Sequence, residues 1–175
     1  MKDQYAGDVG DYVKLALLRA LSIGHKLGVA WYLTSDEHEK NDGRHVGYLD
    51  HERERHWRLL DPKLYDQLRQ IVHDGRRKVS ALEQGLIEGD VRYYSRLLLS
   101  PSERFDWFEK LKTSFEDRDF VFVDPDNGIE PAGYKPGRKK SIKSVTLAEI
   151  ETLVRPQRPL LVYCPSSDNL RHMAA

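Results

Sequence analysis

The chain has 175 residues, which fits a single domain over residues 1–175. Lys plus Arg and Asp plus Glu number 28 each, so the overall charge gives no reason to expect a nucleic acid or a membrane surface as partner. A single cysteine excludes an internal disulfide, and no apolar run approaches the about 20 residues of a membrane helix. We therefore expect a cytoplasmic protein without membrane contact.

The first predicted helix is apolar on nearly all sides. It covers residues 12–22, with Asp11 as its N-cap, and only Lys14 and Arg19 interrupt its apolar surface. A helix of this kind is buried in the protein. Lys14 is therefore expected either to extend its amine to the surface or to meet an anion.

Strand and helix signals alternate along the rest of the chain. The strongest strand signals are uniformly apolar, which is typical of a parallel sheet with helices on both faces. We therefore predict an α/β three-layer sandwich with a mainly parallel sheet. The expected strands cover residues 28–33, 91–94, 120–123 and 159–164. The expected further helices cover 62–74 and 79–86 and begin at two capping boxes, at 100–103 and 146–149.

The helix that follows the first capping box has a clear apolar pattern. Phe105, Phe108, Leu111 and Phe115 recur at helical spacing and predict its buried face. Cys164, at the end of the last predicted strand, is expected to be a small core residue.

The segment 120–130 holds the candidate site. Its apolar strand is stopped by Pro125 and Asn127, and Asp124, Asp126 and Glu130 follow within seven residues. In open α/β sheets, ligands bind at the carboxyl ends of the strands. Residues 124–127 are therefore the candidate catalytic residues.

Two separated pieces of the chain support a resemblance to a known family. Residues 6–14 read Ala-Gly-Asp-Val-Gly-Asp-Tyr-Val-Lys, and residues 124–127 read Asp-Pro-Asp-Asn after an apolar strand. The first piece resembles the N-terminal segment, and the second the Asp-Pro-Pro-Tyr loop, of bacterial 23S ribosomal RNA adenine-N6 methyltransferases. The chain also resembles an uncharacterised bacterial family with the same Asp-Pro-Asp-Asn-Gly segment. The first resemblance implies a Rossmann-like class I methyltransferase core, here without its final strands, and S-adenosylmethionine as cofactor.

The resemblance also implies roles for individual residues. Asp124 would accept a hydrogen of the adenine amine, and Pro125 would offer its carbonyl as a second acceptor. Asp126 and Asn127 stand in the places of the second proline and the aromatic residue of the loop. The residues expected near the cofactor are Tyr5, Gly7, Asp8 and Lys14.

Two other functions stay open. Asp124, Asp126 and Glu130 are hard oxygen ligands that would suit Mg²⁺ in a phosphodiesterase or nuclease. Alternatively, the chain is a non-enzymatic binding module, with an exposed sheet edge at which a homodimer would form.

A basic segment follows the acidic turn. Such residues either contact the phosphates of a nucleic acid, with a salt-dependent affinity, or form a solvated loop. The basic residues are Lys135, Arg138, Lys139, Lys140 and Lys143.

Overall fold

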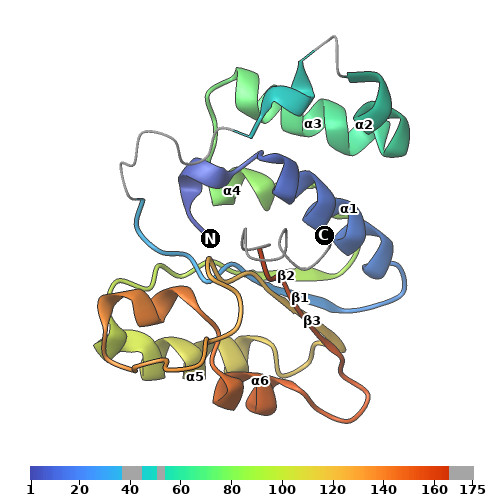
Figure 1. Ribbon diagram of the computed structural model, residues 1–175. Coiled ribbons are helices and arrows are strands. Elements are labelled where there is room, and N and C mark those ends of the chain that lie inside the picture. Colours follow the sequence, from blue (N-terminus) through green and yellow to red (C-terminus); the bar gives the residue numbers. More distant parts are fainter. Residues whose placement is uncertain (37–44, 51–53, 166–175) are drawn as a thin grey trace, which may run out of the picture.

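The computed structural model describes residues 1–36, 45–50 and 54–165. These residues form one four-stranded sheet in the order β2-β1-β3-β4, and every pairing in it is parallel (Figure 1). The α/β class and the parallel sheet are thus confirmed. β2 and β4 are the outer strands of this sheet. The strands are β1 Leu27–Ala30, β2 Val91–Tyr94, β3 Phe120–Val123 and β4 Leu160–Val162.

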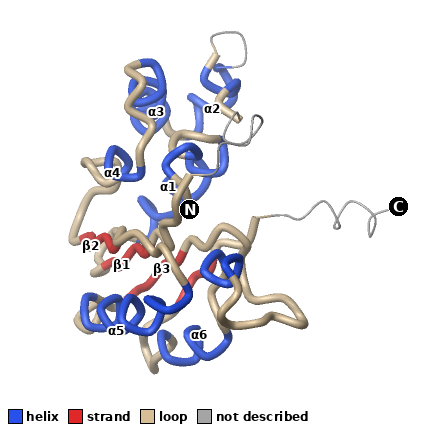
Figure 2. The backbone as a smooth tube through the Cα atoms, turned by 90° about the vertical axis from the view of Figure 1, so that its left-hand side faces the viewer, coloured by secondary structure: helices blue, strands red, loops and turns tan. Residues whose placement is uncertain are grey.

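Helices cover both faces of this sheet. Helices α1 and α4 lie on one face and α5 and α6 on the other, while α2 and α3 pack outside α1 as a further layer (Figures 1 and 2). In chain order the helices are α1 Val9–Leu21, α2 Glu54–Leu60, α3 Pro62–His73, α4 Val79–Leu82, α5 Arg104–Ser114 and α6 Leu147–Leu153.

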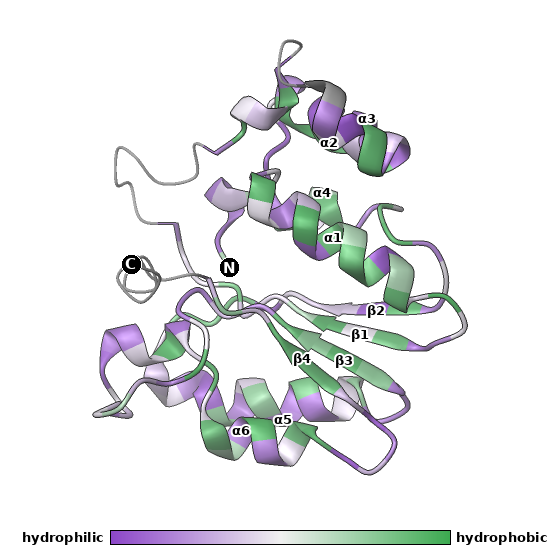
Figure 3. Ribbon diagram, turned by 45° about the vertical axis from the view of Figure 1, so that its right-hand side comes forward, coloured by the Kyte–Doolittle hydropathy of each residue, from purple (hydrophilic) through white to green (hydrophobic). Residues whose placement is uncertain are grey.

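The central strands are buried on both faces because their side chains alternate between two apolar clusters. Leu27 and Val29 of β1 belong to the cluster under α1, and Ala30 belongs to the cluster under α5. In β3, Phe122 faces the first cluster and Val123 the second. Figure 3 shows the resulting apolar colour along the strands.

Several predicted boundaries differ from the structure. Helix α1 begins at Val9, so Asp11 lies in its first turn and is not the N-cap. Its carboxylate instead accepts a hydrogen bond from the Gly7 amide at 2.9 Å and pairs with Lys14. The first strand ends at Ala30, helix α4 ends at Leu82, and Cys164 lies beyond the end of β4, where it is exposed rather than in the core.

The capping box predicted at 100–103 is wrong, and the one at 146–149 is confirmed. The Ser100 side chain makes no cap bond, and a 3₁₀ turn, Pro101–Glu103, precedes α5. The predicted buried face of α5 is confirmed at Phe108, Leu111 and Phe115. Phe105 is 78% exposed and Trp107 is buried instead, because at about 100° per residue Phe105 lies to one side of the stripe that the buried residues share. At 146–149, the Thr146 side chain accepts a hydrogen bond from the Glu149 amide, and the Glu149 side chain accepts one from the Thr146 amide.

No helix in the described ranges is long and apolar enough to cross a membrane.

Candidate functional site

The order of the strands places the site. The second strand in the chain, β2, lies on one side of β1, and the third strand, β3, lies on the other side of β1. The connections therefore reverse direction between β1 and β3, and ligands of open α/β sheets bind outside the carboxyl ends of strands at such a point. Asp124 follows β3 directly at this edge, and its amide donates to the carbonyl of Ala30 at the end of β1.

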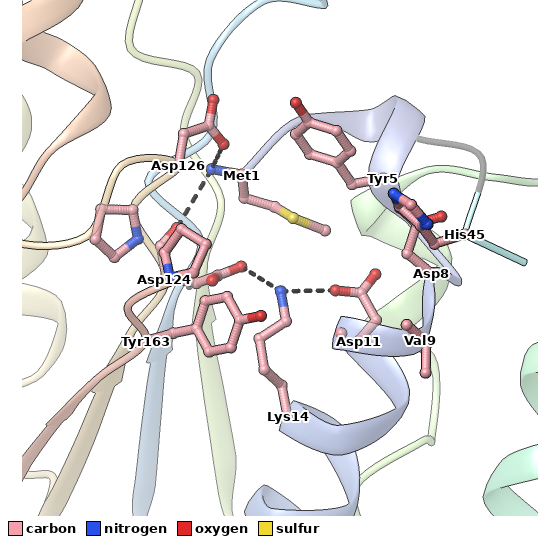
Figure 4. A pocket seen from close by; sticks show the side chains of 13 residues that line it. Met1, Tyr5, Asp8, Val9, Asp11, Lys14, His45, Asp124, Asp126 and Tyr163 are labelled. Carbon is pink, nitrogen blue, oxygen red and sulfur yellow. Dashed lines mark hydrogen bonds and ion pairs between the residues drawn. The ribbon is translucent and has the colours of Figure 1, made fainter. Parts of the chain in front are cut away.

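A crevice of about 640 Å³ lies beside this point, between the ends of β3 and β4 and the start of α1 (Figure 4). Its volume lies within the range of small-molecule sites. We call it the acidic crevice because four aspartates line it. Its lining residues are Met1, Tyr5, Asp8, Val9, Gly10, Asp11, Lys14, His45, Asp124, Pro125, Asp126, Tyr163 and Pro165.

Lys14 lies between two carboxylates at the base of the crevice (Figure 4). Its Nζ lies 2.7 Å from Asp11 Oδ1 and 2.8 Å from Asp124 Oδ2, and all three side chains are buried. Of the two alternatives for Lys14, the structure therefore selects the anion. One ammonium joins the first helix to the end of β3, which fixes the direction in which both carboxylates point.

Burial and charge set the protonation of this group. Burial by itself lowers the pKa of Lys14, but the Asp11 and Asp124 carboxylates raise it by more than burial lowers it. The pKa of Lys14 therefore lies above its ordinary value. Burial raises the pKa of Asp11, the attraction of Lys14 opposes the rise, and the repulsion of Asp124 adds to it. Lys14 is thus a permanent cation at neutral pH, which suits it to positioning rather than to proton transfer.

Aromatic faces line the crevice beside the buried triad, which is formed by Lys14, Asp11 and Asp124. The Tyr163 ring, just after β4, lies 4.7 Å from Lys14 Nζ, a cation–π distance. A side chain at Gly10 would meet the Tyr163 hydroxyl at 3.2 Å, so Gly10 leaves space for this ring. Tyr5 also lines the crevice. Tyr163 thus places an aromatic face in the crevice, just after the neighbouring strand β4.

Asp8 forms the opposite wall. Its Oδ1 accepts a hydrogen bond from Arg77 at 2.9 Å, and the same guanidinium bonds the Ala6 carbonyl. Burial raises the pKa of Asp8 to about 6, although Arg77 opposes the rise. Asp8 is therefore a carboxyl group of the crevice that titrates just below neutral pH.

Asp126 lies on the β3 side of the crevice. Its Oδ2 accepts a hydrogen bond from the Thr34 hydroxyl at 3.2 Å, and its Oδ1 pairs with the Met1 amino group. That amino group also donates to the carbonyls of Tyr32 and Asp124. These contacts hold the turn after β3 against the segment after β1.

Three of the predicted site residues lie elsewhere. Gly7 is buried and does not line the crevice, and its carbonyl accepts a hydrogen bond from the Tyr48 hydroxyl. Asn127 is exposed and lines a different cavity. Glu130 accepts a hydrogen bond from the Leu147 amide at the start of α6. The residues that the structure does bring together in the crevice are Tyr5, Asp8, Lys14, Asp124, Pro125 and Asp126.

The carboxylates predicted for Mg²⁺ meet different donors. Asp124 binds Lys14, Asp126 binds Thr34, and Glu130 caps α6. In the described part of the chain, no group of three or more His, Cys, Asp or Glu side chains is arranged to hold a metal ion.

Sequence reasoning missed Asp11, Arg77 and Tyr163 as site residues. Asp11 and Lys14 are three residues apart, a helical spacing that brings opposite charges together. Tyr163 follows a parallel strand, and the carboxyl ends of parallel strands meet at one sheet edge. No sequence pattern indicates Arg77, because its contact with Asp8 depends on how the segment after α3 folds back.

Comparisons of the chain with protein-family models, curated proteins and solved structures returned no significant match.

Proposed function

We propose that the acidic crevice binds S-adenosylmethionine and that the protein transfers its methyl group to an amine of a nucleotide, free or within a nucleic acid. The observation that carries this proposal is the position of the crevice. A cavity with acidic and aromatic lining lies at the carboxyl ends of the strands, beside the reversal between β1 and β3.

The charge of the crevice favours a cationic ligand. Four aspartates line it, against the ammonium of Lys14, the Met1 amino group and the Arg77 guanidinium that pairs with Asp8. S-adenosylmethionine carries a sulfonium and an α-ammonium group against one carboxylate, so its net charge is positive and such a lining attracts it. Polyphosphate nucleotides would be repelled by it.

Asp124 can also receive a substrate amine. Its Oδ2 is bound to Lys14, but no donor among the described residues contacts its Oδ1. The Pro125 carbonyl accepts a 3.3 Å bond from the Gly128 amide and keeps a second lone pair. These two acceptors would aim the nitrogen lone pair of an amine toward the methyl group. Lys14 would hold the Asp124 carboxylate in place for this role.

Calorimetric titration of the protein with three ligands tests the binding step. S-adenosylmethionine should bind. S-adenosylhomocysteine, which lacks the sulfonium charge, should bind about tenfold more weakly, the equivalent of about 1.4 kcal/mol. ATP should not bind. Absence of heat with S-adenosylmethionine contradicts the proposal, and equal binding of both nucleosides contradicts the charge argument.

The transfer step has a separate test. Radiolabelled methyl groups should move from S-adenosylmethionine to adenosine-containing oligonucleotides, and Asp124→Asn should abolish the transfer while S-adenosylmethionine still binds. Transfer by Asp124→Asn at the parent rate would remove Asp124 from the reaction.

A further inference from the structure

The neutral net charge hides an uneven distribution of paired and unpaired cations. Many exposed basic side chains are paired with a carboxylate, as Arg92 is with Asp117 and Lys110 with Asp106. By contrast, four exposed cations after the acidic turn form no ion pair with any described residue. They are Lys135, Arg138, Lys139 and Lys140.

These four cations line one cavity of about 430 Å³, which we call the basic cavity. Asn127 and Tyr134 line it as well, and no carboxylate side chain does. Unpaired cations that surround a hollow without a counter-charge attract an anion. The two sides of the turn thus differ in charge, because Asp126 lines the acidic crevice and Asn127 lines the basic cavity.

The basic segment is fixed to the acidic turn. The Asn127 amide donates to the Lys143 carbonyl at 2.8 Å, and the Val145 amide donates to the Gly128 carbonyl at 3.0 Å. From the other side, the Arg104 guanidinium donates to the carbonyls of Ser141 and Ser144 at 2.7 and 2.6 Å. A ligand in the basic cavity is therefore held at a set position relative to Asp124.

An aromatic groove adjoins the basic cavity. It has a volume of about 450 Å³ and includes Phe105, Phe108 and Tyr134, of which Tyr134 also lines the basic cavity. Its two carboxylates are each paired within the groove, Glu149 with Arg104 and Glu109 with Lys112, both at 2.6 Å. Phe105 is 78% exposed although its side chain is large and apolar. The groove thus offers ring faces without an uncompensated negative charge.

We propose that the basic cavity and the aromatic groove together bind single-stranded nucleic acid. The inference deepens and rests on the proposed function, because it names the polymer whose amine would reach the acidic crevice. Phosphates suit the unpaired cations, and unpaired bases stack on accessible rings such as the exposed Phe105 and the half-buried Tyr134. A duplex keeps its base faces stacked on each other, so it satisfies only the cations.

Fluorescence anisotropy with labelled oligonucleotides of about 12 nucleotides tests the proposal, in the absence of S-adenosylmethionine. Single-stranded DNA or RNA of mixed sequence should bind at about 50 mM salt and weaken strongly by about 200 mM. A duplex of the same sequence should bind more weakly. No binding of either single strand at the lower salt concentration, or preference for the duplex, overturns the proposal.

A charge-matched pair of triple variants locates the binding surface. Arg138→Gln/Lys139→Gln/Lys140→Gln should lower the slope of log affinity against log salt by about 2. The control, Lys26→Gln/Lys78→Gln/Arg155→Gln, removes three other exposed cations that form no ion pair with described residues. The control should keep the parent slope. Equal effects of the two variants would mean that only the net charge matters, which overturns the assignment of the surface.

A second pair of variants tests the stacking. Phe105→Ala should weaken single-strand binding about 5-fold or more, as the loss of one stacked base does. Ile23→Ala is the control, because Ile23 is also 78% exposed but lies just after α1. Unchanged binding by Phe105→Ala overturns the role of the groove. Because no methyl donor is present, these outcomes do not depend on whether the acidic crevice binds S-adenosylmethionine.

Discussion

Asp126 and Asn127 are neighbours in the chain, yet their side chains line two different cavities of opposite charge. The turn after β3 therefore separates an acidic crevice from a basic cavity. Such a division suits a ligand pair in which a cationic cofactor and an anionic polymer meet at one edge of the sheet. The hydrogen bond from the Asn127 amide to the Lys143 carbonyl fixes the position of the basic cavity relative to the acidic crevice.

The first prediction concerns the shared cation. Lys14→Met leaves Asp11 and Asp124 buried without a counter-charge, so the free energy of unfolding at pH 7 should fall by about 3 kcal/mol or more. The loss should be smaller at pH 4, because burial raises the pKa of Asp11 and this carboxyl group takes up a proton more readily there. Urea denaturation at both pH values measures the effect.

Lys110→Met is the matched control for this variant. Lys110 pairs with Asp106 on the surface, where both side chains are more than half exposed. Its removal should change the free energy of unfolding by about 0.5 kcal/mol or less. A loss for Lys14→Met no larger than that of the control would show that the buried triad is not a stability element.

The second prediction concerns pH. Because the pKa of Asp8 is raised from 3.8 to about 6 in the folded protein, the folded state binds more protons than the unfolded state between these values. The parent therefore loses stability through this group as the pH rises from 4 to 6. Asp8→Asn cannot ionise and escapes this loss.

The comparison is made as a difference between the two proteins, so that the contributions of other groups cancel. The free energy of unfolding of Asp8→Asn minus that of the parent should rise by about 2 kcal/mol between about pH 4 and about pH 7, at about 1.4 kcal/mol for each pKa unit. Chemical denaturation across this range measures it. A difference independent of pH would contradict the raised pKa.

The third prediction concerns the start of α1. Gly7 has φ of 89°, and a Cβ at this position would lie 2.7 Å from Val72 Cγ2. Gly24 has φ of 75° but no atom within 4 Å of the same position. Both alanine variants carry backbone strain of about 1 kcal/mol, and Gly7→Ala adds a further 1–3 kcal/mol, roughly, of overpacking. Thermal unfolding that ranks Gly24→Ala as equally destabilised would contradict the steric argument.

Much of the fold could be predicted because the signals are local. The apolar run at 120–123 and the Asp61-Pro62 helix start depend on adjacent residues, and the structure contains both β3 and α3 there. The buried face of α5 was predicted correctly at Phe108, Leu111 and Phe115 but wrongly at Phe105, which lies to one side of the buried stripe. The capping box at 100–103 was predicted wrongly because the 3₁₀ turn there has the same sequence pattern.

The site was predictable only in part because its contacts are distant in sequence. Asp124 and Lys14 were both expected in it, but they lie 110 residues apart, and no local pattern indicates that they meet. Tyr163 was expected only as part of a strand. Its position over Lys14 follows from the pairing of β3 with β4, which sequence spacing does not reveal.

The most direct test of the central claim is calorimetric titration of S-adenosylmethionine into the parent and into two tyrosine variants. Tyr163→Leu removes the aromatic face of the acidic crevice, whereas Tyr93→Leu removes a half-buried tyrosine from β2, outside the crevice. We predict that the parent and Tyr93→Leu bind equally and that Tyr163→Leu binds about tenfold more weakly, as expected for the loss of one desolvated aromatic contact. Equal binding by all three proteins, or no binding by the parent, would contradict the assignment of the acidic crevice as the cofactor site.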